Sequence, residues 1–96
     1  MVIINGKNYN CGDITINRIE VGKFLYVYYR KYYIANSIND VHGRFKYLFK
    51  ILEIGKNGSY LILERGTKLF SFTTMKNHYA KYANDLTPIK AEVIFK

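Results

Sequence analysis

Residues 45–73 read FKYLFKILEIGKNGSYLILERGTKLFSFT, and this stretch decides the fold class. Its centre, Gly55-Lys56-Asn57-Gly58, is a strong turn sequence, and a turn this tight is best satisfied by strands on both sides. Apolar and aromatic side chains dominate the flanking segments. We therefore predict a meander of three antiparallel strands over residues 45–54, 60–65 and 68–73.

The segment before the turn, residues 37–54, also fits a helix. Apolar side chains recur there at heptad spacing, and Ser37 with Asp40 resembles a capping box. Gly43 in the interior and the aromatic and β-branched residues from 45 onward oppose a helix. The pattern alone leaves strand and helix open. Because the turn at 55–58 favours the strand, we expect at most a helical turn at 37–42.

Towards the N-terminus, short apolar runs separated by glycines predict further strands. Residues 2–4 form a first strand, Asn5-Gly6 a hairpin turn, and Tyr9 and Cys11 the returning strand. Residues 14–21 and 24–30 are predicted as two more strands. If the second of these continued unchanged, Lys31 would enter the core face unpaired, so we expect a bulge or bend at Arg30-Lys31 and a new register over 32–34.

After Thr73 the apolar period changes from two to 3.6 residues. Met75 and Tyr79 share a helical face with Tyr82 and Leu86, and Thr74 is a suitable N-cap, so we predict one helix over about 74–83. Pro88 ends it, and residues 89–96 alternate as a final strand. The fold class is thus β-rich α+β: a twisted antiparallel sheet or a small SH3-like or OB-like open barrel with one helix.

Composition limits the class of protein. The chain has 96 residues, a net charge of +8 and 49% apolar residues, which predicts a single domain over 1–96 and excludes a disordered polyelectrolyte. The longest apolar run has six residues, so we expect no membrane partner, and no secretory signal pattern begins the chain. Ile, Lys, Tyr and Asn, which are read from AU-rich codons, make up 42 residues and suggest an AT-rich bacterial or phage genome. We expect a cytoplasmic protein of a bacterial host cell.

Residues suited to catalysis are few. The histidines are His42 and His78, and the only thiol is Cys11. Asp40 and His42 are the one candidate for a catalytic base with the carboxylate that orients it. No nucleophile or zinc motif surrounds them, and three Cys and His residues are too few for a structural zinc site. A single cysteine also allows no internal disulfide. We therefore predict a protein that is not an enzyme and that needs no metal or cofactor.

The basic residues are clustered together with aromatic rings. Residues 23–50 contain six of the cations, one acid and nine of the sixteen aromatic residues. Cations neutralise phosphates and flat rings stack on unpaired bases, so this window predicts nucleic-acid binding. Strand alternation places Phe24, Tyr26 and Tyr28 on one face as a row of rings. Arg30 follows them on the same face with its guanidinium. Tyrosines also fill buried sheet faces and lysines also cover ordinary surfaces, so a purely structural role stays open.

The leading hypothesis is a small basic binding module for DNA or RNA. The predicted phosphate contacts are Arg30, Lys31, Arg44, Lys46 and Lys50; the predicted base platforms are Tyr26, Tyr28 and Tyr32. Lys76, His78 and Lys81 form a second basic cluster on the exposed side of the predicted helix. Five phosphate contacts to a single strand predict that log K falls against log salt with a slope of roughly −3.5.

Two other hypotheses remain. In size and composition the chain is similar to accessory products of phages and mobile elements, among them anti-CRISPR and other anti-defence inhibitors. An inhibitor of this kind places its Tyr- and Arg-rich surface on an acidic surface of a host nucleic-acid-processing protein. A toxin-like ribonuclease would need His42 or His78 as acid and base. A Tyr-bearing strand edge also leaves a homodimer open.

Overall fold

The computed structural model describes residues 1–12, 19–41, 43, 47–81 and 88–94. Within these residues, eight strands and two short 3-10 helices form. The strands are β1 (Val2–Ile4), β2 (Lys7–Cys11), β3 (Phe24–Tyr28), β4 (Lys31–Ala35), β5 (Leu48–Ile54), β6 (Tyr60–Ser71), β7 (Lys76–Lys81) and β8 (Ile89–Val93). The helices are η1 (Ile38–Asp40) and η2 (Lys56–Gly58).

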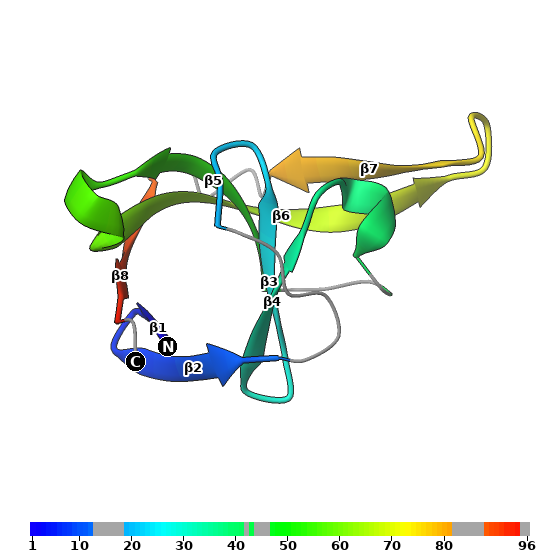
Figure 1. Cartoon of the computed structure of the whole chain (residues 1–96). Coiled ribbons are helices and arrows are strands. Elements are labelled where there is room, and N and C mark those ends of the chain that lie inside the picture. The colour runs from blue at the N-terminus through cyan, green and yellow to red at the C-terminus, as the bar shows by residue number, and fades with distance from the viewer. Residues whose placement is uncertain (13–18, 42, 44–46, 82–87, 95–96) are drawn as a thin grey trace.

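Seven of these strands close into a barrel, seen end-on as a ring in Figure 1. The order around the ring is β5-β3-β4-β2-β1-β8-β6, and pairing of β5 with β6 closes it. The pairs are antiparallel except for β2 and β4, which run parallel over two residue pairs. The β-rich class is confirmed, and the closed barrel is compatible with the predicted SH3-like or OB-like barrel.

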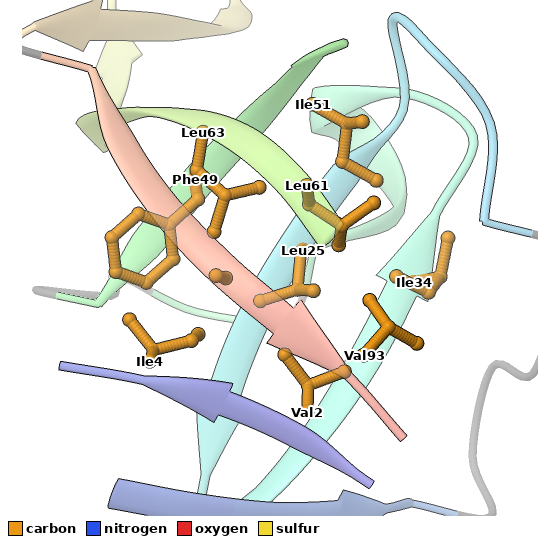
Figure 2. Packing of buried hydrophobic residues seen from close by; sticks show 10 residues of the cluster. Val2, Ile4, Leu25, Ile34, Phe49, Ile51, Leu61, Leu63 and Val93 are labelled. Atoms are coloured by element: carbon orange, nitrogen blue, oxygen red, sulfur yellow. The ribbon is translucent and has the colours of Figure 1, made fainter. Parts of the chain in front are cut away.

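The barrel interior is filled by apolar side chains from most of its strands. Figure 2 shows Val2, Ile4, Leu25, Ile34 and their neighbours from the other strands pointing toward one another. Leu25, Ile51, Leu61 and Leu63 are fully buried. These buried side chains fill the described part of the barrel interior.

Two hairpins of the barrel use left-handed turns. Asn5 and Gly6 join β1 to β2 with φ of 50° and 78°, which confirms the hairpin expected from this dipeptide. Tyr29 and Arg30 join β3 to β4 with φ of 50° and 61°. The chain therefore reverses at Tyr29-Arg30, one residue before the predicted bend, and Lys31 becomes an exposed residue of β4.

A second apolar cluster lies outside the barrel wall. Phe24 and Tyr26 point outward from β3 and pack with Tyr33, Val41 and Leu48. The segment around η1 and the side chain of Tyr79 from β7 complete this cluster. Both faces of β3 are therefore buried over its first residues, and the predicted water-facing row of rings is wrong for Phe24 and Tyr26.

Strand β6 continues past the barrel and, with β7, forms a protruding hairpin. Its residues Gly66–Ser71 pair with Lys76–Lys81, and the two strands extend to the right of the ring in Figure 1. We call residues 66–81 the arm. The predicted third strand at 68–73 is thus the second half of β6, and β7 is the third strand of the meander.

The predicted helix over 74–83 is wrong for the residues that the structure describes. Residues 72–75 form the arm's turn, with Met75 at φ 54°, and residues 76–81 are β7. Thr74 does not cap a helix: its N–H donates to Ser71 Oγ at 3.4 Å, within the turn. The backbone of 76–81 pairs instead with β6, which satisfies its donors and acceptors without a helix.

The other predicted elements are confirmed in part. The helical turn expected at 37–42 is confirmed as η1. The strands predicted at 45–54 and 89–96 are confirmed as β5 over 48–54 and β8 over 89–93, whereas residues 47 and 94 are described and are not strand. Residues 19–22, at the end of the predicted strand 14–21, are not strand, and residues 13–18 lie outside the described chain. His42 also lies outside it.

Candidate nucleic-acid interface

One end of the barrel carries a hollow of about 510 Å³ lined by cationic and aromatic side chains. Its lining residues are Lys7, Asn8, Tyr9, Val27, Tyr29, Arg30 and Tyr47. They come from β2, from the end of β3 and its turn, and from the residue before β5. We call this hollow the mouth. Residues from three separate segments meet there because the ring places β2 beside the β3–β4 hairpin.

The mouth continues inward into a smaller hollow of about 90 Å³. Both hollows share Lys7, Tyr9, Val27 and Tyr47, and the inner one adds Ile4, Asn5, Phe49, Arg65 and Ile89. The Arg65 guanidinium lies 5.6 Å from the centre of the Tyr47 ring, a cation–π distance. The inner end is closed by Ile4 and Phe49, which belong to the barrel core.

The charge of the mouth has one sign. Lys7 and Arg30 line its outer part and Arg65 its inner part, and no acidic residue is among the described residues that line either hollow. Cations around a concave, low-dielectric wall reinforce one another's field and attract anions. The lining also contains the rings of Tyr9, Tyr29 and Tyr47.

The outer rim of the mouth is a strained turn. Tyr29 and Arg30 both adopt positive φ, where residues with a Cβ are disfavoured by about 1–2 kcal/mol each. Tyr29 is 82% exposed, and its ring meets that of Tyr28 edge-on, with centroids 4.3 Å apart. A hydrogen bond with Tyr29 raises the pKa of Tyr28 above its usual value. Strain of this kind persists where surrounding structure imposes it and is often linked to function.

Three of the predicted site residues lie at this rim. Arg30 lines the mouth itself. Tyr28 is 44% exposed and contacts Tyr29, so its ring is accessible from water. Lys31 follows the turn, is exposed and pairs with Asn10 of β2. The predicted site residues Tyr28, Arg30 and Lys31 therefore lie together on the β3–β4 hairpin.

Two predicted base platforms, Tyr26 and Tyr32, contribute to the packed parts of the fold, Tyr26 wholly and Tyr32 in part. Tyr26 is 2% exposed and stacks on Tyr33 with ring centroids 5.3 Å apart. Tyr32 is half-buried and packs against the barrel core. Burial, with a contact to Cys11, raises the pKa of Tyr32 to about 12. Both rings therefore contribute to packing within the fold.

The other predicted cations do not join the mouth. Lys50 is half-buried on β5, opposite Phe24 and Glu64 in the sheet register. Lys76 and Lys81 begin and end β7 on the arm, where Lys81 forms an ion pair with Glu64. Arg44 and Lys46 lie outside the described residues. A continuous basic stripe from 23 to 50 is therefore not seen in the described chain.

The sequence analysis did not single out several residues of the two hollows, among them Lys7, Tyr9, Tyr29, Tyr47 and Arg65. Lys7 and Tyr9 follow a recognisable hairpin turn, so their exposure at a barrel end could have been expected. Tyr29 would share a face with Leu25 and Val27 if the predicted strand continued to residue 30, but β3 ends at Tyr28. Tyr47 and Arg65 reach the two hollows because ring closure brings the predicted β5–β6 hairpin near β2 and the β3–β4 turn, a long-range arrangement that no local pattern shows.

The tip of the arm is the second notable surface. Phe72 is 84% and Met75 71% exposed, and Phe70 meets Phe72 edge-on with centroids 5.2 Å apart. At its base, Lys68 is buried and its ammonium donates to the carbonyl of Val41, a burial that lowers the pKa of Lys68. The arm thus has an anchored base and an apolar tip.

Comparison with known proteins leaves the geometry as the main guide to function. No protein-family model, no curated protein and no solved structure matches this chain. Among the described residues, no group of three or more His, Cys, Asp or Glu is placed to hold a metal ion. The helices in that same part of the chain are too short and too polar to cross a membrane.

Proposed function

We propose that this protein is a non-enzymatic module that binds single-stranded nucleic acid at the mouth. The observation that carries the proposal is the convergence of Tyr9, Tyr29 and Tyr47 with Lys7 and Arg30 in one acid-free hollow. Phosphate groups require cations and unpaired bases require aromatic or apolar faces, and single-strand binding proteins combine both. Lys31 adds a cation beside the rim.

A single strand fits this site better than a duplex. The tyrosine rings line a recess, and in a duplex the base faces are stacked on one another and cannot enter it. The strained hairpin supports the same function, since it holds Tyr29 and Arg30 at the rim although Asn-Gly would form that turn with less strain.

The experiment is fluorescence anisotropy with labelled single strands of about ten nucleotides, as DNA and as RNA, and with a duplex of the same sequence. Lys7, Arg30 and Lys31 supply three phosphate contacts, so log K should fall against log salt with a slope of roughly −2. Lys7→Ala should lower the affinity. Lys56→Ala removes the same charge at the exposed η2 turn between β5 and β6 and should not. Affinity independent of salt, or equal loss in both variants, would contradict the proposal.

A second candidate function is favoured by the arm. An inhibitor from a phage or mobile element that binds a host nucleic-acid-processing protein needs a protruding contact element. Large apolar side chains such as Phe72 and Met75 are enriched at the centres of protein interfaces. Lys68 is buried and Lys81 is ion-paired with Glu64, so Lys76 is the exposed cation of the arm that would favour an acidic partner surface.

This candidate is tested by purification from the host after nuclease treatment. The expected result is one host protein retained in stoichiometric amount, lost with Phe72→Ser and retained with Tyr29→Ala, and inhibited when the purified chain is added back. Retention that does not depend on Phe72, or no effect on the captured protein's activity, would reject the inhibitor function.

A further inference from the structure

We propose that the mouth holds a single nucleotide unit, with the base inserted toward Tyr47 and Arg65 and the phosphate at Lys7 and Arg30. This inference rests on the proposed function and specifies it: the ligand is one nucleotide in a pocket, not a run of bases along a platform. The unit is either a free nucleoside monophosphate or one nucleotide of a strand, and the two share the same chemistry.

The first argument is that the mouth is a blind pocket. Its inner end is closed by Ile4 and Phe49 of the packed core. A strand therefore cannot pass through it, and only a group that enters and leaves by the same side can be bound. A nucleotide at a strand end, a nucleotide turned out of a strand, or a free nucleotide meets this condition.

The second argument is size. Pockets for small organic ligands generally measure about 300–1,000 Å³, and the mouth measures about 510 Å³. Single-strand platforms instead spread about 4–16 nucleotides over an open sheet face. The corresponding outer face of β3 is closed here by the second apolar cluster, since Phe24 and Tyr26 are buried. In the described barrel the outer face of β3 is therefore covered, and the mouth is the surface proposed to bind the ligand.

The third argument is the order of chemistry with depth. The inner hollow has the apolar walls of Ile4, Phe49 and Ile89. Of its two cations, Arg65 lies against the Tyr47 ring, and Lys7 is shared with the outer hollow. A base has apolar faces and hydrogen-bonding edges, which suits this environment better than a phosphate, whose charge requires several donors. Arg30 lines only the outer hollow, and the exposed Lys7 lines both hollows. The cations that would bind a phosphate are therefore at the entrance.

The test is competition against a bound labelled oligonucleotide, with the wild-type chain. Nucleoside 5′-monophosphates should displace the label at concentrations at least tenfold lower than either inorganic phosphate or an uncharged nucleoside. An abasic strand of the same length should bind at least tenfold more weakly. If the oligonucleotide binds but phosphate competes as well as the nucleotide, or the abasic strand binds equally, the pocket is overturned while single-strand binding stands.

The remaining outcomes separate the two proposals. If nucleoside monophosphates bind directly by calorimetry and oligonucleotides do not, the pocket is supported with a free nucleotide as its ligand, and strand binding is overturned. If neither binds, both are overturned.

A blocking variant gives an independent check of location. Val27 lines both hollows and is half-buried, so Val27→Phe fills the mouth without changing its charge. It should weaken nucleotide competition at least tenfold, whereas Val21→Phe, at an exposed position before β3, should leave it unchanged. Undiminished nucleotide binding by a folded Val27→Phe variant would overturn the assignment.

Discussion

Arg30 has a backbone conformation that its side chain disfavours, so replacing it with glycine should stabilise the fold and weaken binding at the same time. At φ 61° a residue with a Cβ is strained by about 1–2 kcal/mol, and glycine is not. Glycine also makes the unfolded chain more flexible, which offsets about 0.4–1 kcal/mol of that gain. For Arg30→Gly the expected net gain is about 1 kcal/mol, or roughly 4–8 °C in Tm for a domain of this size.

The same substitution removes one cation from the rim of the mouth. One phosphate contact to a single strand contributes about 0.7 to the salt slope, which corresponds to about a fivefold loss of affinity at 0.1 M salt. Anisotropy titrations at several salt concentrations measure both the affinity and the slope, and thermal unfolding by circular dichroism measures the stability.

Met75→Gly is the matched control. Met75 also has positive φ, 54°, and is exposed, but it lies at the tip of the arm, away from the mouth. Its replacement should raise stability by a similar amount and leave nucleic-acid affinity unchanged. A lower Tm for Arg30→Gly would contradict the strain at this turn. Wild-type oligonucleotide affinity in both variants would contradict a phosphate contact at Arg30.

Three further predictions concern individual rings. A Cβ at Gly66 would overlap the Tyr79 ring, so Gly66→Ala should displace that ring and lower the free energy of unfolding by about 1–3 kcal/mol in urea titrations; a change below about 0.5 kcal/mol would contradict this packing. Tyr26→Ala should cost about 3–5 kcal/mol of stability because the ring is buried, whereas Tyr29→Ala should cost about 1–3 kcal/mol of binding and little stability; the reverse order would place the site elsewhere. Because the pKa of Tyr32 is raised to about 12, above its unfolded value of 10.0, its neutral form stabilises the fold fully below pH 10 and this contribution is lost as pH rises from 10 to 12; Tyr32→Phe should remove that part of the alkaline destabilisation and the tyrosinate absorbance that appears near pH 12.

The strands and most turns could be predicted because their determinants are local. Asn5-Gly6 favours positive φ, and Gly55–Gly58 separates two apolar runs, so each hairpin is specified by a few neighbouring residues. The Tyr29-Arg30 turn has no such residue and could not be located from its sequence. Its position follows from pairing between β3 and β4, which buries Leu25 and Ile34 together in the core.

The predicted helix at 74–83 shows a different limit. Met75 and Tyr79 are four residues apart, and that spacing places two side chains on one face of a helix and also on one face of a strand. The distinction depends on whether a partner strand is available. β6 is long enough to pair with β8 through its first half and with β7 through its second. The sequence predicts two strands, 60–65 and 68–73, separated at Gly66, whereas Gly66 lies within one continuous strand. Its missing side chain leaves room for the Tyr79 ring.

The position of the candidate site follows from how a small barrel uses its surface. The interior is filled by the cluster around Leu25, and the outer wall at β3 and β4 is covered by the η1 segment and the base of the arm. The barrel ends are therefore where polar and aromatic side chains can meet around a hollow without displacing core residues. At the end described here, β2, the β3–β4 turn and Tyr47 meet because the ring closes, so three tyrosines and two cations distant in sequence become neighbours. A composition rich in Tyr and Lys predicts that such a surface exists, but ring closure decides which of those residues form it.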